Sequence, residues 1–263
     1  MKLGARPTPQ HLIDAATPHQ IVGITPSEFL HIPPELSTWG NDEYGDCVTA
    51  EEAFAKVCTN HGIFLPDDVV IGWAAYHGYL DGAVLYHVMQ TMQKYGFPMG
   101  GTNYNDGLIF HVNWRDREIL QNAISRGPIK LGITSSQQLS RRWRSTNGWF
   151  ATGMTATGDL EHCISICGYG SFSWLASQFH VSVPGNPNQM GYAIFTWGSI
   201  GIIDETSLQN ITLEAWLRSP TNNIEPPDNV YFEALGGEVG KVLSHSRDQL
   251  WLQKGYQGEG ELF

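Results

Sequence analysis

Helical periodicity dominates the first half of the chain, and its separation from a strand-rich second half is the feature that most constrains the fold. Asp46 is a typical N-cap residue, and apolar side chains follow it at helical spacing as far as Cys58. Cys47 therefore lies in the first turn of a predicted helix. Further helical patterns cover residues 69–77 and 85–95, so this half of the chain is expected to be helical.

Alternating apolar residues mark the second half of the chain. A short helix is predicted after Asp116, and residues 129–134 then alternate apolar with polar or small side chains. The same alternation covers 162–168, and a third apolar strand covers 192–197. Residues 171–190 are predicted to form a further excursion of strand and turn. The two halves together predict an α+β fold.

Size and charge limit the classes of function. The chain has 263 residues, of which 41% are hydrophobic, enough for a sizeable core in one domain or in two lobes that share an interface. Its formal net charge of −11 disfavours a nucleic acid partner, because an acidic chain does not attract phosphates. The basic run Arg141–Arg144 is interpreted as a solvated turn, with a binding patch as the less favoured alternative.

The N-terminal residues carry no targeting pattern. The sequence MKLGARPTPQ lacks the apolar region of a signal peptide, and no run approaches the ~20 apolar residues of a membrane span. We therefore expect no membrane partner and a cytoplasmic or virion-associated protein. Residues 1–36 are rich in Pro, Thr and His, which predicts an extended arm lying over the fold or a partly disordered segment. Such an arm could be a pro-segment-like inhibitor, an element for assembly or a wall of a cleft.

The four cysteines bear on both redox state and metal binding. Cys47, Cys58, Cys163 and Cys167 are too few for a dense disulfide framework, which favours a reducing compartment. Cys163 and Cys167 together with His162 form an alternative zinc set. Strand alternation, however, points His162 away from both of these cysteines. We therefore expect neither a metal nor another cofactor.

Cys47 and His162 are the candidates for nucleophilic chemistry. A thiol attacks a carbonyl carbon as the thiolate, and a helix N-terminus and a nearby imidazolium both lower the thiol pKa. Gly45 permits a close approach of substrate backbone. His162 opens an apolar strand, from which it can face a cleft as a general base. Taken singly, Cys47 is equally well a buried free cysteine, and His162 is more readily a structural histidine.

Four segments in a fixed order carry a resemblance to the papain-like cysteine peptidases. In that family they correspond to the oxyanion glutamine with the nucleophile, a helix with its strand, the base with its strand, and an aromatic Trp-Gly turn. The matching segments are NDEYGDC at 41–47, ILQNAISRGPIKLGIT at 119–134, HCISICGYG at 162–170 and YAIFTWG at 192–198. A closer resemblance is to papain-like proteins of phage and bacterial genomes that carry a "GND..GDC" start, a "GH…GY" strand and a "TWG" turn.

The resemblance spans about residues 36–218 and implies a papain-like fold, with a helical left lobe packed against an antiparallel β-rich right lobe. It also implies that Cys47 is the nucleophile and His162 the base. Asn41 stands where the family has its oxyanion-hole glutamine and would act with the backbone N–H of Cys47. A loop asparagine that caps a turn is an equally good interpretation of Asn41.

The residue that orients the histidine departs from the family pattern. The family asparagine falls at Phe195 in a gapless match and at Thr196 with one deletion. A hydroxyl can accept a hydrogen bond from an imidazole N–H and a phenyl ring cannot, so we predict Thr196. Thr196 is equally well an ordinary strand threonine. Trp197 is predicted to shield the Cys–His pair from water.

Four regions are predicted along the chain. They are an extended N-terminal arm over 1–36, a helical lobe with the nucleophile over 37–106, a β-rich lobe with the histidine over 107–218, and a C-terminal extension over 219–263.

The leading functional hypothesis is a cysteine hydrolase, either a peptidase or an amidase, with a peptide or protein substrate. It would act through a Cys47–His162 thiolate–imidazolium pair and a thioester acyl-enzyme. Acyl transfer to an amine in place of water stays open. The alternative is a catalytically degraded papain-like fold that serves as a structural or binding component of a phage particle or another assembly. In that case the N-terminal arm and the C-terminal tail would meet the assembly partners.

Overall fold

The computed structural model describes residues 2–60 and 62–219, together with 231–234, 238–246, 249–254 and 260–262. The chain divides into two units, Met1–Asn222 and Asn223–Phe263. In the first unit the described helices are α1 (Gln10–Ala15), α2 (Cys47–Thr59), α3 (Asp67–His77), α4 (Leu85–Tyr95), α5 (Arg117–Ile124), α6 (Ser136–Arg142), α7 (Phe172–Gln178) and α8 (Glu205–Ile211).

The main sheet of the first unit is mostly antiparallel and has the order β6-β12-β7-β9-β10-β11-β8, with a short strand β2 paired to β9. Only the β8–β11 pairing within this sheet is parallel. Its strands are β2 (Phe29–Leu30), β6 (Ile109–His111), β7 (Ile129–Ile133), β8 (Trp149–Ala151), β9 (His162–Ser171), β10 (Met190–Thr196), β11 (Ser199–Asp204) and β12 (Thr212–Arg218).

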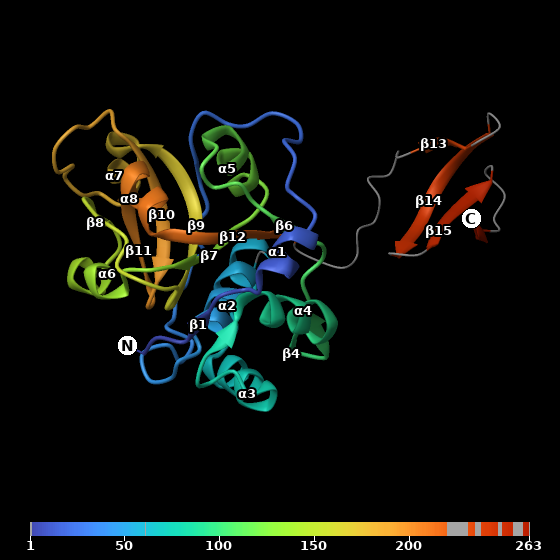
Figure 1. Ribbon diagram of the computed structural model, residues 1–263, viewed down its shortest axis with the longest axis horizontal. Helices are drawn as coiled ribbons and strands as arrows, with labels where there is room; N and C mark the ends of the chain where they lie inside the picture. Colours follow the sequence, from blue (N-terminus) through green and yellow to red (C-terminus); the bar gives the residue numbers. More distant parts are fainter. Residues whose placement is uncertain are drawn as a thin grey trace. The chain divides into compact units, whose positions relative to one another are not determined.

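Two pairs of short strands complete this unit. In one, β1 (Ala5–Arg6) lies parallel to β3 (Ala83–Val84), which joins the N-terminal arm to the loop before α4. In the other, β4 (Phe97–Met99) lies antiparallel to β5 (Thr102–Tyr104). Figure 1 shows α2, α3 and α4 grouped together, with α2 against β9 and β10 of the main sheet. The described part of the first unit thus has the predicted α+β arrangement of a helical lobe and a β-rich lobe.

Helix α2 lies at the centre of the first unit. All of its residues from Cys47 to Cys58 are buried, because the helix packs against both β9 and the other helices. The ring of Phe54 stacks on that of Phe195 from β10, with ring centroids 4.1 Å apart. A second apolar cluster fills the β-rich lobe under α5 and α8. Packing of α2 against the sheet therefore holds the two lobes together and fixes the position of Cys47 at the helix start.

A buried ion network crosses the same interface. It consists of three acidic and three basic side chains that are almost fully buried: Glu51, Glu52, Lys56, Asp106, Lys130 and Arg218. Lys130 Nζ lies 2.7 Å from carboxylate oxygens of both Glu51 and Glu52. Arg218 contacts the same two glutamates at 2.6 and 2.8 Å, and Lys56 pairs with Asp106. Opposite charges in contact make burial of each charged group tolerable.

The prediction of strand and turn for residues 171–190 is wrong in its first part. Phe172–Gln178 form helix α7, because the Ser171 hydroxyl caps the helix by accepting a hydrogen bond from the N–H of Trp174 at 3.2 Å. The basic run that begins at Arg141 is not simply a solvated turn either. Its first two residues end α6, and the Trp143 ring packs edge-on against Trp197.

The predicted N-terminal arm is extended for most of its length but includes helix α1 and strands β1 and β2. The second unit lies within the predicted C-terminal extension. Its described strands β13 (Tyr231–Ala234), β14 (Glu238–Ser246), β15 (Gln249–Lys254) and β16 (Gly260–Leu262) form an antiparallel sheet in sequence order. None of the helices in the described residues combines the length and the apolar character needed to cross a bilayer.

Candidate active site

Cys47 is the first residue of α2, directly after the N-cap residue Asp46. Its side chain is buried, with 2% of its surface exposed. Burial raises the pKa of the Cys47 thiol to about 11, although backbone hydrogen bonds from Cys163 and Gly4 act in the opposite direction. The sulfur therefore lies between the start of β9 and the N-terminal arm, and in this arrangement it is a thiol at neutral pH.

His162 is the first residue of β9 and is fully buried. Its Nε2 atom lies 2.8 Å from Thr196 Oγ1. Its Nδ1 atom has no hydrogen-bond partner among the described residues. Burial lowers the pKa of the imidazole to about 3, so the ring is neutral at neutral pH. The structure thus holds one edge of the ring on a hydroxyl and leaves the other edge unpaired.

The two alternatives for the orienting residue, Phe195 and Thr196, have opposite environments. They are neighbours on β10, so their side chains point to opposite faces of the sheet. Phe195 stacks on Phe54 in the core between the lobes, whereas the Thr196 hydroxyl contacts the His162 ring. The register of β10 therefore places the threonine, and not the phenylalanine, beside the histidine.

Trp197 covers the face of the histidine ring. The His162 and Trp197 rings are stacked with centroids 4.4 Å apart and an interplanar angle of 14°. Trp197 and Gly198 both have positive φ, at 46° and 79°, and join β10 to β11 as a two-residue hairpin turn. Trp143 supports this turn by donating from its indole Nε1 to the carbonyl of Thr196 at 3.3 Å.

Asn41 is buried six residues before Cys47. Its side-chain amide donates to the carbonyl oxygen of Tyr44 at 3.2 Å and to that of Lys2 at 3.4 Å. The first contact matches a turn-capping asparagine. The second shows that the amide also reaches a carbonyl of the chain segment that lies over the site, so the two interpretations of Asn41 are compatible.

The N-terminal arm runs directly over Cys47. The N–H of Ala5 donates to the carbonyl of Glu161, the residue before His162, at 3.3 Å. The carbonyl of Gly4 accepts from the N–H of Ala83 at 2.7 Å, next to the β1–β3 pairing. Farther along, the N–H of Thr8 donates to a carboxylate oxygen of Glu214 at 3.1 Å. Main-chain bonds to both lobes therefore hold the arm across the candidate site.

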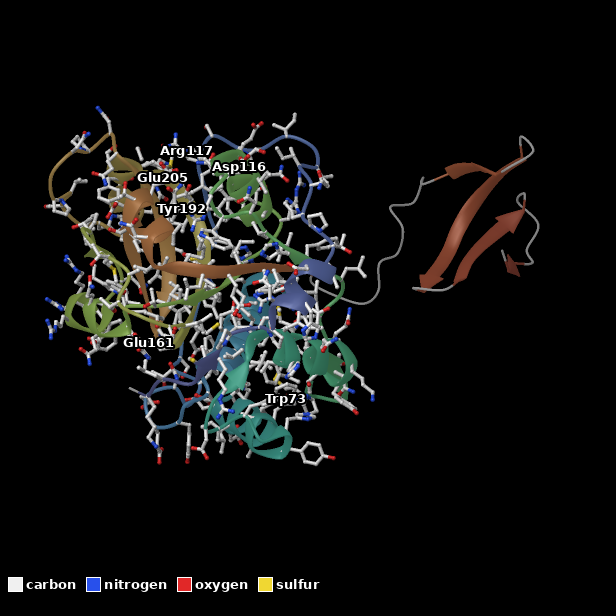
Figure 2. All side chains as sticks on the ribbon, viewed as in Figure 1. Trp73, Asp116, Arg117, Glu161, Tyr192 and Glu205 are labelled. Carbon is white, nitrogen blue, oxygen red and sulfur yellow. The ribbon has the colours of Figure 1, made fainter. Side chains whose placement is uncertain are left out.

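Some residues at the site carry no sequence signal that would have identified them. Glu161 fixes the start of α6 through hydrogen bonds from the N–H and hydroxyl of Ser136, at 2.8 and 2.7 Å. Figure 2 labels Glu161 at the opposite end of the β-rich lobe from the Arg117–Glu205 ion pair. Its role at the site comes from its backbone carbonyl, which contacts the arm, and any residue could supply that group.

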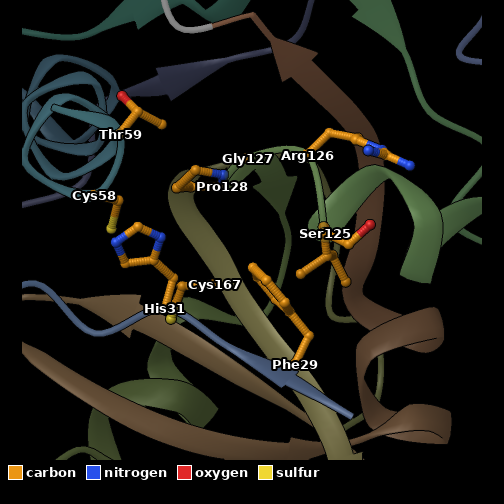
Figure 3. Close-up of a pocket in the computed structure, with 10 residues that line it drawn as sticks. Phe29, His31, Cys58, Thr59, Ser125, Arg126, Gly127, Pro128 and Cys167 are labelled. Atoms are coloured by element: carbon orange, nitrogen blue, oxygen red, sulfur yellow. The ribbon is translucent and has the colours of Figure 1, made fainter. Parts of the chain in front are cut away.

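A separate cavity of about 200 Å³ lies elsewhere in the first unit. Figure 3 shows Cys58, Cys167 and His31 together on its wall. Among the described residues no group of three or more His, Cys, Asp or Glu side chains could hold a metal ion. His162 and Cys163 are neighbours on β9, so their side chains point to opposite faces of the sheet.

No protein-family model and no curated protein sequence matches the chain. Solved structures do. Xylellain, a cysteine protease from Xylella fastidiosa, aligns with a TM-score of 0.57 at 12% identity over 83% of this chain and 96% of that one. Digestive procathepsin L 3 of Tenebrio molitor gives 0.56 at 14% identity over 78% and 73%. The ragweed pollen cysteine protease Amb a 11, in its proform, gives 0.55 at 14% over 80% and 72%. The chain therefore has a papain-like fold.

Proposed function

We propose that the protein is a cysteine hydrolase that acts on peptide-like bonds, with Cys47 as the nucleophile and His162 as the general base. The observation that carries this proposal is the hydrogen bond between His162 Nε2 and Thr196 Oγ1. When the Nε2–H donates to the threonine, Nδ1 carries the lone pair and is available to accept a proton. The Cys47 thiol lies beside the backbone of Cys163 at the start of β9 and would supply that proton once the site opens, since in the closed structure Nδ1 has no hydrogen-bond partner among the described residues.

The proposed reaction has two halves. His162 Nδ1 takes the Cys47 proton, and the sulfur attacks the substrate carbonyl carbon to form a tetrahedral oxyanion. The imidazolium then protonates the leaving amine as the C–N bond breaks, which leaves a thioester. In the second half His162 deprotonates a water that attacks the thioester, and the returned proton restores the thiol. An amine in place of water would give acyl transfer by the same steps.

Asn41 and Trp197 have supporting roles in this proposal. The Asn41 amide already donates to a carbonyl oxygen of the overlying chain, which supports a role as an oxyanion donor beside Cys47. The Trp197 ring, stacked on His162, keeps water from that face of the imidazole. Exclusion of water strengthens the interaction of the imidazole with the thiol and with Thr196.

The arm that covers Cys47 keeps this site closed. In the closed state burial keeps both the thiol and the imidazole neutral, so reaction requires the arm to leave. Gly4 offers a way to displace it, because a Cβ at this position would lie 1.7 Å from the carbonyl oxygen of Gly45. The matched control is Gly72→Ala, since Gly72 lies on α3 with nothing within 4 Å of an added Cβ.

The test compares alkylation of the four thiols by iodoacetamide at pH 7.5 in the Gly4→Ala and Gly72→Ala variants. In Gly4→Ala we expect Cys47 to react at least about tenfold faster than Cys58, Cys163 or Cys167, because it alone gains access and a base. In Gly72→Ala all four should stay slow. Peptide hydrolysis by Gly4→Ala that disappears in Gly4→Ala/Cys47→Ala would complete the case, and equal slow labelling of all four thiols would contradict it.

The role of Thr196 gives a second prediction. In the Gly4→Ala background, Thr196→Val removes the acceptor of the Nε2–H and should slow Cys47 alkylation about tenfold, the worth of one neutral hydrogen bond. Thr196→Ser keeps the hydroxyl and should stay within about twofold of its parent. A pH profile of the Cys47 alkylation rate separates loss of His162 orientation from misfolding. Loss of the hydroxyl should shift the pH of the inflection in this profile as well as lower the rate. Equal rates for the valine and serine variants would exclude Thr196 as the orienting residue.

The alternative function is that of a structural or binding component of an assembly, including a phage particle. The closed site favours it, because a thiol sealed under the chain's own arm has no access to a substrate. In that case the arm and the C-terminal extension would meet partner proteins, and Cys47 in Gly4→Ala would react no faster than the other buried thiols. The same labelling experiment therefore separates the two functions.

A further inference from the structure

Two glycines contact the N-terminal arm where it covers Cys47. Gly45 contacts the arm at Leu3, where a Cβ would come within 2.9 Å of the carbonyl oxygen of that residue. Gly82, with a φ of 100°, contacts the next residue of the arm, where a Cβ would come within 2.7 Å of the carbonyl oxygen of Gly4. We call the space between Gly45 and Gly82 the glycine slot. A chain in this slot meets backbone at both glycines.

The arm occupies the slot as an extended peptide would. Its contacts are made by the main chain, with the Gly4 carbonyl bonded to Ala83 and the Ala5 N–H bonded to Glu161. The β1–β3 pairing extends this main-chain contact by one residue, to Arg6 opposite Val84. Addition of an extended segment to a strand edge gives affinity through backbone bonds and selects sequence through the space left for side chains. The arm therefore shows how an extended main chain is held in the slot by backbone bonds alone.

The space for side chains differs sharply along the arm. At Gly4 a Cβ would lie 1.7 Å from the Gly45 carbonyl oxygen, which is an immovable backbone atom. Ala5 is 6% exposed, so this position holds a small buried side chain. Leu3 is 43% exposed, and the Arg6 guanidinium reaches outward to the carbonyl of Asp81 at 3.2 Å. Only the central position excludes every side chain, and the next one favours a small residue.

We propose that the glycine slot makes this site selective for peptides with glycine at the position beside the Cys47 sulfur, followed by a small residue. The arm sequence Leu3-Gly4-Ala5-Arg6 is such a peptide, bound within its own chain. Peptide turnover at this site rests on the proposed function, but selection of glycine by the slot is a property of binding and does not require Cys47 to be catalytic.

The arm also explains why an added peptide would not bind to the intact chain. A segment tethered to its own site competes at a high effective concentration, on the order of millimolar. Displacement of the arm by Gly4→Ala removes this competitor without changing either wall of the slot. The Gly4→Ala variant therefore provides an open site in an otherwise full-length protein.

The test measures how well two synthetic hexapeptides protect Cys47 from iodoacetamide in Gly4→Ala. One is acetyl-KLGARP-amide, and the other is acetyl-KLAARP-amide, which differs by one methyl group. The glycine peptide should slow Cys47 alkylation at concentrations roughly tenfold to a hundredfold lower than the alanine peptide, because the methyl meets backbone. The Gly72→Ala variant, with its arm in place, should show no protection by either peptide.

A second variant covers the case in which Gly4→Ala does not fold. In Gly45→Ala the added methyl narrows the slot itself and should also release the arm. Neither peptide should slow Cys47 alkylation in this variant, because the slot is blocked. Equal protection by the two peptides in Gly4→Ala, or Cys47 labelling in Gly4→Ala as slow as in Gly72→Ala, would overturn glycine selection. Fast Cys47 labelling and selective protection without any peptide turnover would instead overturn the hydrolase and leave the slot's selectivity intact.

Discussion

Cys47 in the intact chain is expected to react with iodoacetamide about a hundredfold more slowly at pH 8 than an unperturbed cysteine. The reason is the thiolate population. Burial raises the pKa of the Cys47 thiol to about 11, from an ordinary value of 9.0. At pH 8 a thiol with a pKa of 11 is about 0.1% ionised, against about 10% for a pKa of 9, and the thiolate is the reacting species.

The sign of the pH dependence follows from the raised pKa. Because ionisation is incomplete at every pH below about 11, the alkylation rate should climb about tenfold per pH unit from pH 7 to pH 10. The His162 imidazole adds no inflection in this range, since burial lowers its pKa to about 3. Mass spectrometry of the peptide that contains Cys47, after timed alkylation of the protein, measures the rate. The same peptide from protein alkylated in urea gives the rate of the unperturbed cysteine.

Gly4→Ala supplies the comparison for this profile. Release of the arm returns water to the sulfur and so removes the main cause of the raised pKa of the Cys47 thiol. The inflection should therefore move to lower pH in Gly4→Ala and stay in place in Gly72→Ala. A plateau below pH 9 in the unmodified protein would show that Cys47 is not sealed by the arm.

Several features of the fold follow from local sequence patterns. The position of Cys47 in the first helical turn was predictable because Asp46 precedes an apolar pattern of helical period. The start of β9 at His162 was predictable from strict alternation. Helix α7 was missed because it is only seven residues long, and the capping by Ser171 that sets its start is a weak signal next to the surrounding turn residues.

The choice between Phe195 and Thr196 shows what local patterns leave open. Sequence chemistry favours the residue that can accept a hydrogen bond, but which of two neighbours faces the histidine depends on strand register. The pairing of Thr196 with Ser199 and the two-residue turn at Trp197-Gly198 fix that register. The positive φ angles of Trp197 and Gly198 depend on tertiary contacts. Among these contacts is the hydrogen bond from the Trp143 indole to the Thr196 carbonyl.

The sequence left the place of the arm open between an inhibitor-like segment, an element for assembly and a cleft wall, because periodicity does not set its contacts. Its contact with Cys47 depends on a glycine that is unremarkable in sequence and on partners about 40, 80 and 160 residues away, Gly45, Ala83 and Glu161. The buried ion network escaped prediction for a related reason. Adjacent glutamates on a helix normally suggest a solvated face, whereas here α2 packs against the sheet and the side chains of Lys130 from β7 and Arg218 from β12 pair with both glutamates.

Replacement of Lys130 by methionine is expected to lower the free energy of unfolding by about 3–5 kcal/mol, because it removes one partner of a buried ion network. Lys130 is fully buried and contacts Glu51 and Glu52 at 2.7 Å each, and it donates to the carbonyl of Val48 at 2.8 Å. Methionine fills the space of the lysine stem but leaves the two carboxylates facing one cation, Arg218, instead of two.

The charge balance of the network gives this prediction a stringent control. With Lys130 lost, three carboxylates face two cations, whereas Lys130→Met combined with Glu52→Leu restores equal numbers. If the loss of stability comes from the unpaired charge, the double variant should lose less free energy of unfolding than the two single variants lose in sum. The difference should exceed about 1 kcal/mol. Urea unfolding with a constant m-value measures all three, and the exposed Lys94→Met should stay within about 0.5 kcal/mol of the parent. A Lys130→Met protein as stable as Lys94→Met would mean that the buried carboxylates have taken up protons. The free energy of unfolding of Lys130→Met should then fall as the pH is raised and these carboxylates ionise.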